Sequence, residues 1–146
     1  KIERAMAGDG ALVPAANIVG TTVRIAFHPS SAEVLIETFM YTGAHHGLLR
    51  VLGDQYLKDL NELLAPERFN GIIGDDIGEE LRISGKAART RIVKFRKRVK
   101  EDFRDALGRA LGDNDIVENV PDRNGYRLNP RIVRLLRWDQ MPDREA

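Results

Sequence analysis

Clustered lysine and arginine residues are the clearest candidates for a binding function in this sequence. Residues 82–104 contain ten basic and two acidic side chains, whereas residues 54–80 contain two basic and eight acidic ones. The net charge of the whole chain is only +1, so the total hides a strong separation of charge along the sequence. Such a separation sets up an oriented field that can steer a polyanion to one face of a protein. The basic segment is therefore the first candidate binding element.

A helix over residues 84–104 would sort these cations onto one side. On a wheel of about 100° per residue, the apolar residues fall on one narrow face and the lysines on the opposite face. The apolar face consists of Ala88, Ile92, Phe95, Val99 and Phe103, and the opposite face of Lys86, Thr90, Lys94 and Lys97, flanked by Arg89, Arg91, Arg96 and Arg98. Ser84 is placed to cap the helix start. Such a helix fits the major groove of B-DNA, where Val93 can contact a thymine methyl group.

The residues before this helix favour a helix-turn-helix. Asp75 and Asp76 suit the start of a short helix over residues 75–81, because acidic groups are favourable at a helix N-terminus. Gly78 is the small residue that two crossing helices need at their closest contact. Arg82 stands in the turn where glycine is usual. The helix expected over residues 55–64 is an alternative partner for the basic helix, and the sequence leaves this choice open.

Two further elements are expected nearer the N-terminus. Residues 18–27 have the alternation and β-branched content of a half-buried strand. Residues 28–43 are expected to form a helix, because Ser30 and Glu33 have the capping-box spacing, an apolar stripe follows, and Gly43 is a natural stop.

After the basic helix, the sequence predicts a β-hairpin. The runs DIVENV and YRL are joined by PDRNG, which contains the proline, asparagine and glycine of a tight turn. Arg123 is expected at its tip, where it can enter a narrow minor groove, and Arg127 follows just beyond. Residues 132–138 are expected to form a final short helix or a packed tail, with Trp138 packing on the core rather than serving a partner.

The order of these motifs resembles the winged-helix effector domains of the OmpR/PhoB type. TRIVKFRKRVK is similar to the recognition helix of that family, NGYRLNP to its wing and last strand, and VRIAFHPSSAEVLIETF to its first strand and helix. The resemblance covers roughly residues 23–130. It implies that the long helix reads the major groove and that the wing contacts the minor groove or the phosphates. It also implies a protein-contact surface before the recognition helix, for which RNA polymerase or another regulator is the candidate partner.

Enzyme, cofactor and metal chemistry have little support. The chain has no cysteine, which excludes disulfides and thiolate ligands and permits a reducing, cytoplasmic location. His45 and His46 are adjacent, so on a helix they point about 100° apart, and no third ligand follows at suitable spacing. Asp75 and Asp76 are better explained as helix-start residues than as catalytic carboxylates. The sequence has no phosphate-binding glycine loop, nucleophile elbow or membrane-spanning apolar run.

The sequence therefore predicts an α+β, mostly helical winged helix-turn-helix with a C-terminal β-hairpin wing. Residues 1–17 are expected to be a flexible lead-in, 18–138 the domain and 139–146 a tail; whether a domain precedes Lys1 is left open. The predicted function is sequence-specific binding of double-stranded DNA as a transcription regulator, without catalysis, cofactor or metal. The predicted DNA-binding residues are Ser84, Lys86, Arg89, Thr90, Val93, Lys94, Lys97, Arg123 and Arg127. A homodimer and an architectural DNA binder without sequence preference are kept as alternatives. A further alternative is a protein-interaction module on the same scaffold, in which the acidic residues 54–80 and the extension at residues 107–111 bind another protein.

Overall fold

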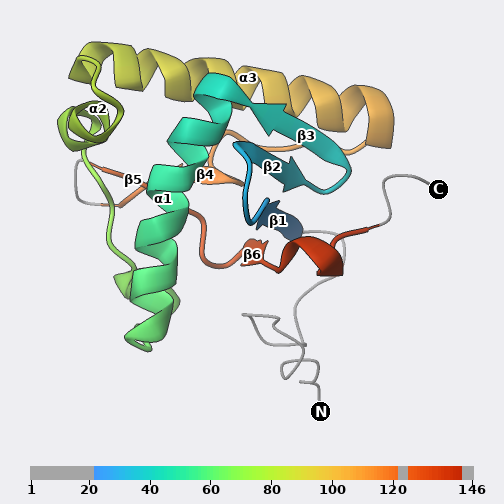
Figure 1. Cartoon of the computed structure of the whole chain (residues 1–146), viewed down its shortest axis with the longest axis horizontal. Coiled ribbons are helices and arrows are strands. Elements are labelled where there is room, and N and C mark those ends of the chain that lie inside the picture. The colour runs from blue at the N-terminus through green and yellow to red at the C-terminus, as the bar shows by residue number, and fades with distance from the viewer. Residues whose placement is uncertain (1–21, 122–124, 143–146) are drawn as a thin grey trace.

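The computed structural model describes residues 22–121 and 125–142, in which a mixed four-stranded sheet forms one layer (Figure 1). The strand order is β3-β2-β1-β6. Strands β1 (Val23–Phe27), β2 (Glu33–Ile36) and β3 (Phe39–Thr42) are antiparallel neighbours, whereas β6 (Val133–Leu135) runs parallel to β1. The sheet thus joins strands from the two ends of the described chain.

Helices cover one face of this sheet. Helices α1 (Gly43–Asn61) and α3 (Gly85–Leu107) pack on it, whereas α2 (Gly74–Leu81) lies against α3 and α1. Short 3₁₀ turns occur at Pro66–Arg68 and Trp138–Gln140. A separate hairpin of β4 (Val117–Asn119) and β5 (Tyr126–Leu128) follows α3. In Figure 1, α3 is the long helix along the top of the molecule, and α1 runs across it at the side where α2 and the hairpin also lie. The predicted α+β class with a largely helical body is confirmed.

The main core lies between the sheet and the helices. Ile25 and Ile36 project from the sheet, Leu48 comes from α1, and Phe95 and Phe103 come from α3; all five side chains are fully buried. A fully buried side chain of this size contributes roughly 1.5–3 kcal/mol relative to an exposed one. This burial fixes α3 rigidly to the rest of the molecule.

The opposite face of the sheet is covered by the chain that follows β6. Ala26 and Leu35 are fully buried there together with Met141, and Leu136 and Trp138 pack against them. The Trp138 ring also meets the His28 ring edge-on, with 4.7 Å between centroids. The prediction that Trp138 packs on the protein is therefore confirmed.

The helix predicted over residues 28–43 is wrong, because this segment forms the β2–β3 hairpin. Both sides of β2 are covered, so Val34, Leu35 and Ile36 are consecutive buried residues without strand alternation. The connecting turn places Glu37 at φ 53°, which no right-handed helix contains. The carboxylate of Glu37 accepts hydrogen bonds from the backbone and guanidinium of Arg24 on β1, and these bonds hold the turn in place.

The remaining predicted elements agree with the structure only in part. Gly43, the expected helix stop, is instead the first residue of α1, so the helix predicted over residues 55–64 begins earlier than expected and ends earlier as well, at Asn61. Residues 132–138 contain β6 and the start of a 3₁₀ turn, because β6 finds its hydrogen-bond partner in β1; of the two predicted alternatives, the short helix is wrong and the packed tail agrees with the structure. The predicted strand is confirmed over Val23–Phe27, while its earlier residues, the lead-in and the end of the tail lie outside the described residues.

Candidate nucleic-acid interface

Helix α3 is anchored by the apolar face that its sequence predicts. Its five predicted anchoring residues are buried: Ala88, Ile92, Phe95, Val99 and Phe103. Ser84 occupies the N-cap, where its hydroxyl oxygen accepts a hydrogen bond from the backbone N–H of Ala87 at 3.0 Å. The helix ends at Gly108, whose φ of 62° allows a left-handed cap. Residue pattern and capping therefore fix both the position and the rotation of α3.

Helix α2 is the partner that packs directly before α3. A β-carbon on Gly78 would lie 2.6 Å from the carbonyl oxygen of Ile83, so only glycine fits at this crossing. The turn between the helices places Arg82 in the left-handed region, with φ 61° and ψ 42°. This is the conformation that glycine adopts most easily. The structure thus confirms the short helix, the tight contact at Gly78 and α2 as the partner of α3.

The face of α3 opposite the core is a cationic surface, which we call the α3 stripe: Lys86, Arg89, Thr90, Val93, Lys94 and Lys97. All six residues are exposed. Arg89 lies 3.5 Å from Asp75, and Lys97 lies 3.6 Å from Glu101. Exposed ion pairs of this kind contribute at most about 1 kcal/mol, so these cations can exchange partners at little cost. Val93 interrupts the charges with an apolar side chain that is 64% exposed.

The β4–β5 hairpin is held beside α3 by Arg96. Its guanidinium donates hydrogen bonds to the carbonyl oxygen of Val117, at 2.6 Å from Nη2, and to Oδ1 of Asn119, at 2.7 Å. It also lies over the Tyr126 ring, 5.9 Å from the centroid. Burial lowers the pKa of Arg96 from its usual value. Arg96 therefore uses its charge inside the protein and is a positioning residue rather than part of the exposed stripe.

A third segment pairs with the hairpin from the other side. The backbone N–H of Ile72 donates to the carbonyl oxygen of Tyr126 at 2.8 Å, and the N–H of Tyr126 donates back at 2.9 Å. A β-carbon on Gly71 would lie 2.4 Å from the Val120 side chain, so the approach of the two segments requires glycine. The hairpin is thereby fixed to the chain that leads into α2 as well as to α3.

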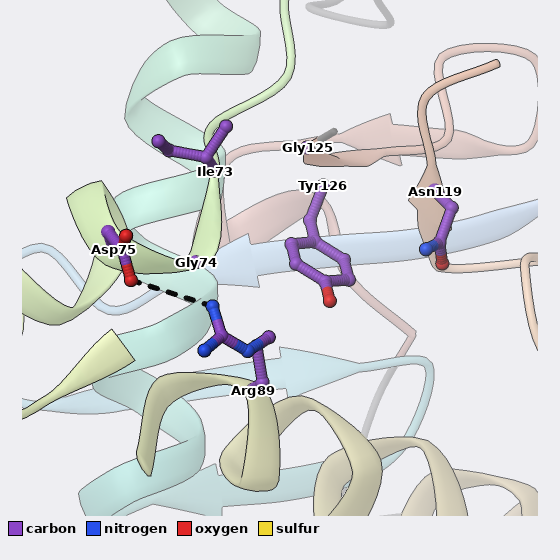
Figure 2. A pocket seen from close by; sticks show the side chains of 7 residues that line it. All are labelled: Ile73, Gly74, Asp75, Arg89, Asn119, Gly125 and Tyr126. Atoms are coloured by element: carbon purple, nitrogen blue, oxygen red, sulfur yellow. Dashed lines mark ion pairs between the residues drawn. The ribbon is translucent and has the colours of Figure 1, made fainter. Parts of the chain in front are cut away.

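These elements enclose a cleft of about 350 Å³ where α2, α3 and the hairpin meet (Figure 2). Its lining consists of Ile73, Gly74, Asp75, Arg89, Asn119, Gly125 and Tyr126. Figure 2 shows the Tyr126 ring between Arg89 on α3 and Asn119 on the hairpin, with the Arg89 guanidinium directed at Asp75. The sequence-based site omitted Asn119 and Tyr126, although their position beside the predicted NG turn was a signal that they flank the basic helix.

Two arginines predicted for the hairpin have different outcomes. Arg127 is only 5% exposed, and its guanidinium donates to Glu118 at 2.6 Å and to the carbonyl oxygen of Phe69 at 2.7 Å. A buried charge needs such partners, so Arg127 fastens the hairpin internally and does not reach the surface; we remove it from the interface. Arg123 lies outside the described residues.

The two histidines at the start of α1 face different neighbours. The His45 ring packs edge-on against Tyr41 and Phe95, whereas the His46 ring meets Phe27. Burial lowers the pKa of both imidazoles, and the nearby Arg98 adds to the effect on His45. Within residues 22–121 and 125–142, no group of three or more His, Cys, Asp or Glu side chains is arranged to hold a metal ion.

Among the described residues, no helix combines the length and apolar character that crossing a membrane requires. The chain matches no protein-family model, no curated protein and no solved structure.

Proposed function

We propose that this chain is a winged-helix domain that binds double-stranded DNA with sequence preference and acts as a transcription regulator in the cytoplasm. In this proposal α3 enters the major groove and the β4–β5 hairpin serves as the wing at the minor groove or the phosphates. The observation that carries the proposal is the division of α3 into a fully buried apolar face and an exposed cationic one. The order of α2, tight turn, α3 and hairpin agrees with the helix-turn-helix and wing expected from the sequence.

The dimensions of α3 suit this role. A helix with its side chains is about 10–12 Å wide, close to the roughly 12 Å width of the major groove. The buried anchors turn the whole α3 stripe outward, where Arg89 and Lys97 hold only exposed ion pairs. An arginine in the groove reads guanine through two hydrogen bonds. For Arg89 to bind a base it must break its exposed ion pair with Asp75, which costs at most about 1 kcal/mol. We therefore assign sequence reading to Arg89 and its neighbours on the stripe.

Selection of bound sequences from a random duplex pool tests the proposal most directly. We expect enrichment of one motif, and the spacing of any repeated half-sites reports whether two copies bind together. The salt dependence of the affinity then counts phosphate contacts, because the slope of log affinity against log salt is about −0.9 per neutralised phosphate.

Two variants connect this binding to the α3 stripe. Arg89→Ala and Lys94→Ala should weaken binding to the selected duplex while leaving the melting temperature nearly unchanged, since both side chains are exposed. Lys58→Ala removes the same charge from the exposed end of α1 and serves as the control. Wild-type affinity in both stripe variants would overturn the docking of α3, and equal affinity for unrelated duplexes would replace sequence reading by architectural binding.

A protein-interaction module is the second candidate, and one observation favours it. A groove of about 620 Å³ lies between α1 and α2, away from the α3 stripe, and its lining includes Asp54, Asp76, Glu79 and Glu80. Such a surface suits a basic partner. Indifference to DNA at low salt, together with concentration-dependent association with a protein partner, would support this candidate and refute DNA binding.

A further inference from the structure

Helix α3 is longer than major-groove contact requires. It has 23 residues and runs on past Lys97 to Leu107. From Lys86 to Arg104 the axis measures about 27 Å at 1.5 Å per residue, whereas the major groove is roughly 12 Å wide. A straight rod of this length that lies in the groove must therefore cross the phosphate backbone at one end. The geometry leaves either end for the backbone, and the last turns of α3 are the end that carries cations beyond the α3 stripe.

Those last turns carry cations in line with the α3 stripe. Lys100 and Arg104 follow Lys97 at helical spacing, so the three side chains share the outer face of the helix. They line a cleft of about 400 Å³ whose other wall is formed by the loop that follows α3, at Asp113. We call this space the overhang cleft.

The partners now held by these cations are exposed carboxylates. The Lys100 ammonium donates a hydrogen bond to Oδ1 of Asp113 at 2.6 Å, and Arg104 pairs with Asp105 at 2.9 Å. Lys97 pairs with Glu101, which also lines the cleft, at 3.6 Å. The side chains of Asp113 and Asp105 are 69% and 68% exposed, so both pairs are weakened by water and salt. The hydrogen bond and charge of the Lys100 ammonium also lower the pKa of Asp113. A carboxylate oxygen thus already binds Lys100 in the lining of the cleft.

We propose that the overhang cleft is a phosphate site for the backbone of the bound duplex. A phosphodiester oxygen takes the place of Asp113 on Lys100, while Lys97 and Arg104 neutralise the same phosphate or its neighbour. This inference rests on the proposed function and adds a sequence-independent contact to it. The Asp113 carboxylate then competes with DNA phosphate for Lys100, because DNA must displace it before the lysine can bind phosphate.

The test measures the affinity of the whole chain for its selected duplex at several salt concentrations. Replacing Lys100 and Arg104 together by alanine should make the slope of log affinity against log salt less steep by about 0.9 for each phosphate that is no longer neutralised. That corresponds to roughly an eightfold weaker affinity per phosphate at 0.1 M salt. The order of preference among different duplex sequences should not change, in contrast to Arg89→Ala. Urea unfolding of the double variant establishes that it folds as the wild type does.

A variant that is expected to tighten DNA binding keeps the test independent of folding defects, because a folding defect would only weaken binding. Asp113→Asn frees Lys100 and should tighten binding, whereas Asp54→Asn makes the same charge change in the acidic groove and should tighten it less. If the wild type binds DNA but the double variant keeps its slope, or if Asp113→Asn gains no more than Asp54→Asn, the phosphate site is refuted and the proposed function stands. If the wild type shows no salt-dependent binding to any duplex, the proposed function fails and the phosphate site with it.

Discussion

Replacing Arg96 by methionine should loosen the hairpin from α3 without changing the fold of the sheet. Methionine keeps a long, flexible side chain against Tyr126 but removes every donor. The variant therefore lacks two hydrogen bonds to the carbonyl oxygen of Val117, at 2.6 and 3.2 Å, and one to Asn119 at 2.7 Å. The hairpin strands have only three residues each, and a two-stranded hairpin of this size is marginal by itself.

The expected decrease in unfolding free energy is about 1–3 kcal/mol. Hydrogen bonds from a charged donor contribute roughly 1.5–3 kcal/mol each when buried. Arg96 is half-buried, so water competes for its donors, and the bond to exposed Asn119 adds little. The two bonds to Val117 share one acceptor and count as one interaction. Because Arg127 and the Ile72 pairing still hold the hairpin, the effect should stay local rather than unfold the domain.

Urea unfolding and amide hydrogen exchange measure the two parts of this expectation. Arg96→Met should lower the free energy of unfolding and speed exchange in β4 and β5. If the hairpin is the wing of the proposed function, DNA affinity should fall as well, because the hairpin loses its position beside α3. Lys94→Met, an exposed charge removal on the same helix, should change stability by less than about 0.5 kcal/mol. An Arg96→Met protein with wild-type stability and unchanged exchange in the hairpin would refute the anchoring role.

Three further predictions concern the turn, the stripe and α1. Arg82→Gly should raise the free energy of unfolding, measured in urea, by about 0.5–1 kcal/mol, because it removes left-handed backbone strain at φ 61°. The control Lys94→Gly, inside α3, should lower the free energy of unfolding by about 1 kcal/mol. If both variants are less stable than the wild type, Arg82 is not strained. Val93→Ala should weaken binding about fivefold, or about 1 kcal/mol, only to duplexes that have thymine under α3. Deoxyuridine lacks the methyl group, so the variant and the wild type should bind a duplex with deoxyuridine at that position equally. Weaker binding of the variant to the thymine and the deoxyuridine duplex alike would exclude the methyl contact. Burial lowers the pKa of His45 in the folded state. As the pH falls, the unfolded state therefore binds this proton first, and stability should decrease below about pH 6.5. His45→Gln should reduce this decrease in thermal melts; the same dependence of melting temperature on pH in both proteins would refute the role of His45.

The parts of the candidate site that the sequence predicted are those set by short-range rules. The anchoring face of α3 follows from helical spacing, and Ser84 marks its start through a capping preference; its end at Leu107, before the left-handed cap Gly108, was not predicted. The hairpin follows from the turn residues of PDRNG. Arg127 was misjudged because its buried partner Phe69 lies far away in the sequence, and a charged residue beside a turn is normally exposed.

The errors in the fold have the same physical origin. In residues 28–43, the spacing of Ser30 and Glu33 imitates a helix cap, but the Ser30 backbone N–H donates to His28 in a turn instead. The turn at Glu37 has no glycine to announce it, because its left-handed backbone is held by Arg24 on another strand. At both places tertiary contacts override the local conformational preference, and such contacts cannot be identified from the spacing of residues in a single sequence.

Strand β6 pairs with β1 from nearly the opposite end of the described chain, and this sets the order in which a nascent domain can be completed. The stretch from α2 through the hairpin is contiguous, so it can assemble from short-range contacts while synthesis continues. Strands β1 to β3 are also contiguous, but the fourth strand is added only once Val133–Leu135 has been made, and contacts between such distant segments form slowly. Until then β1 keeps an open edge that invites pairing with other chains. A molecule cut short before β6 should therefore still form its cationic helix and yet be the form most prone to aggregate.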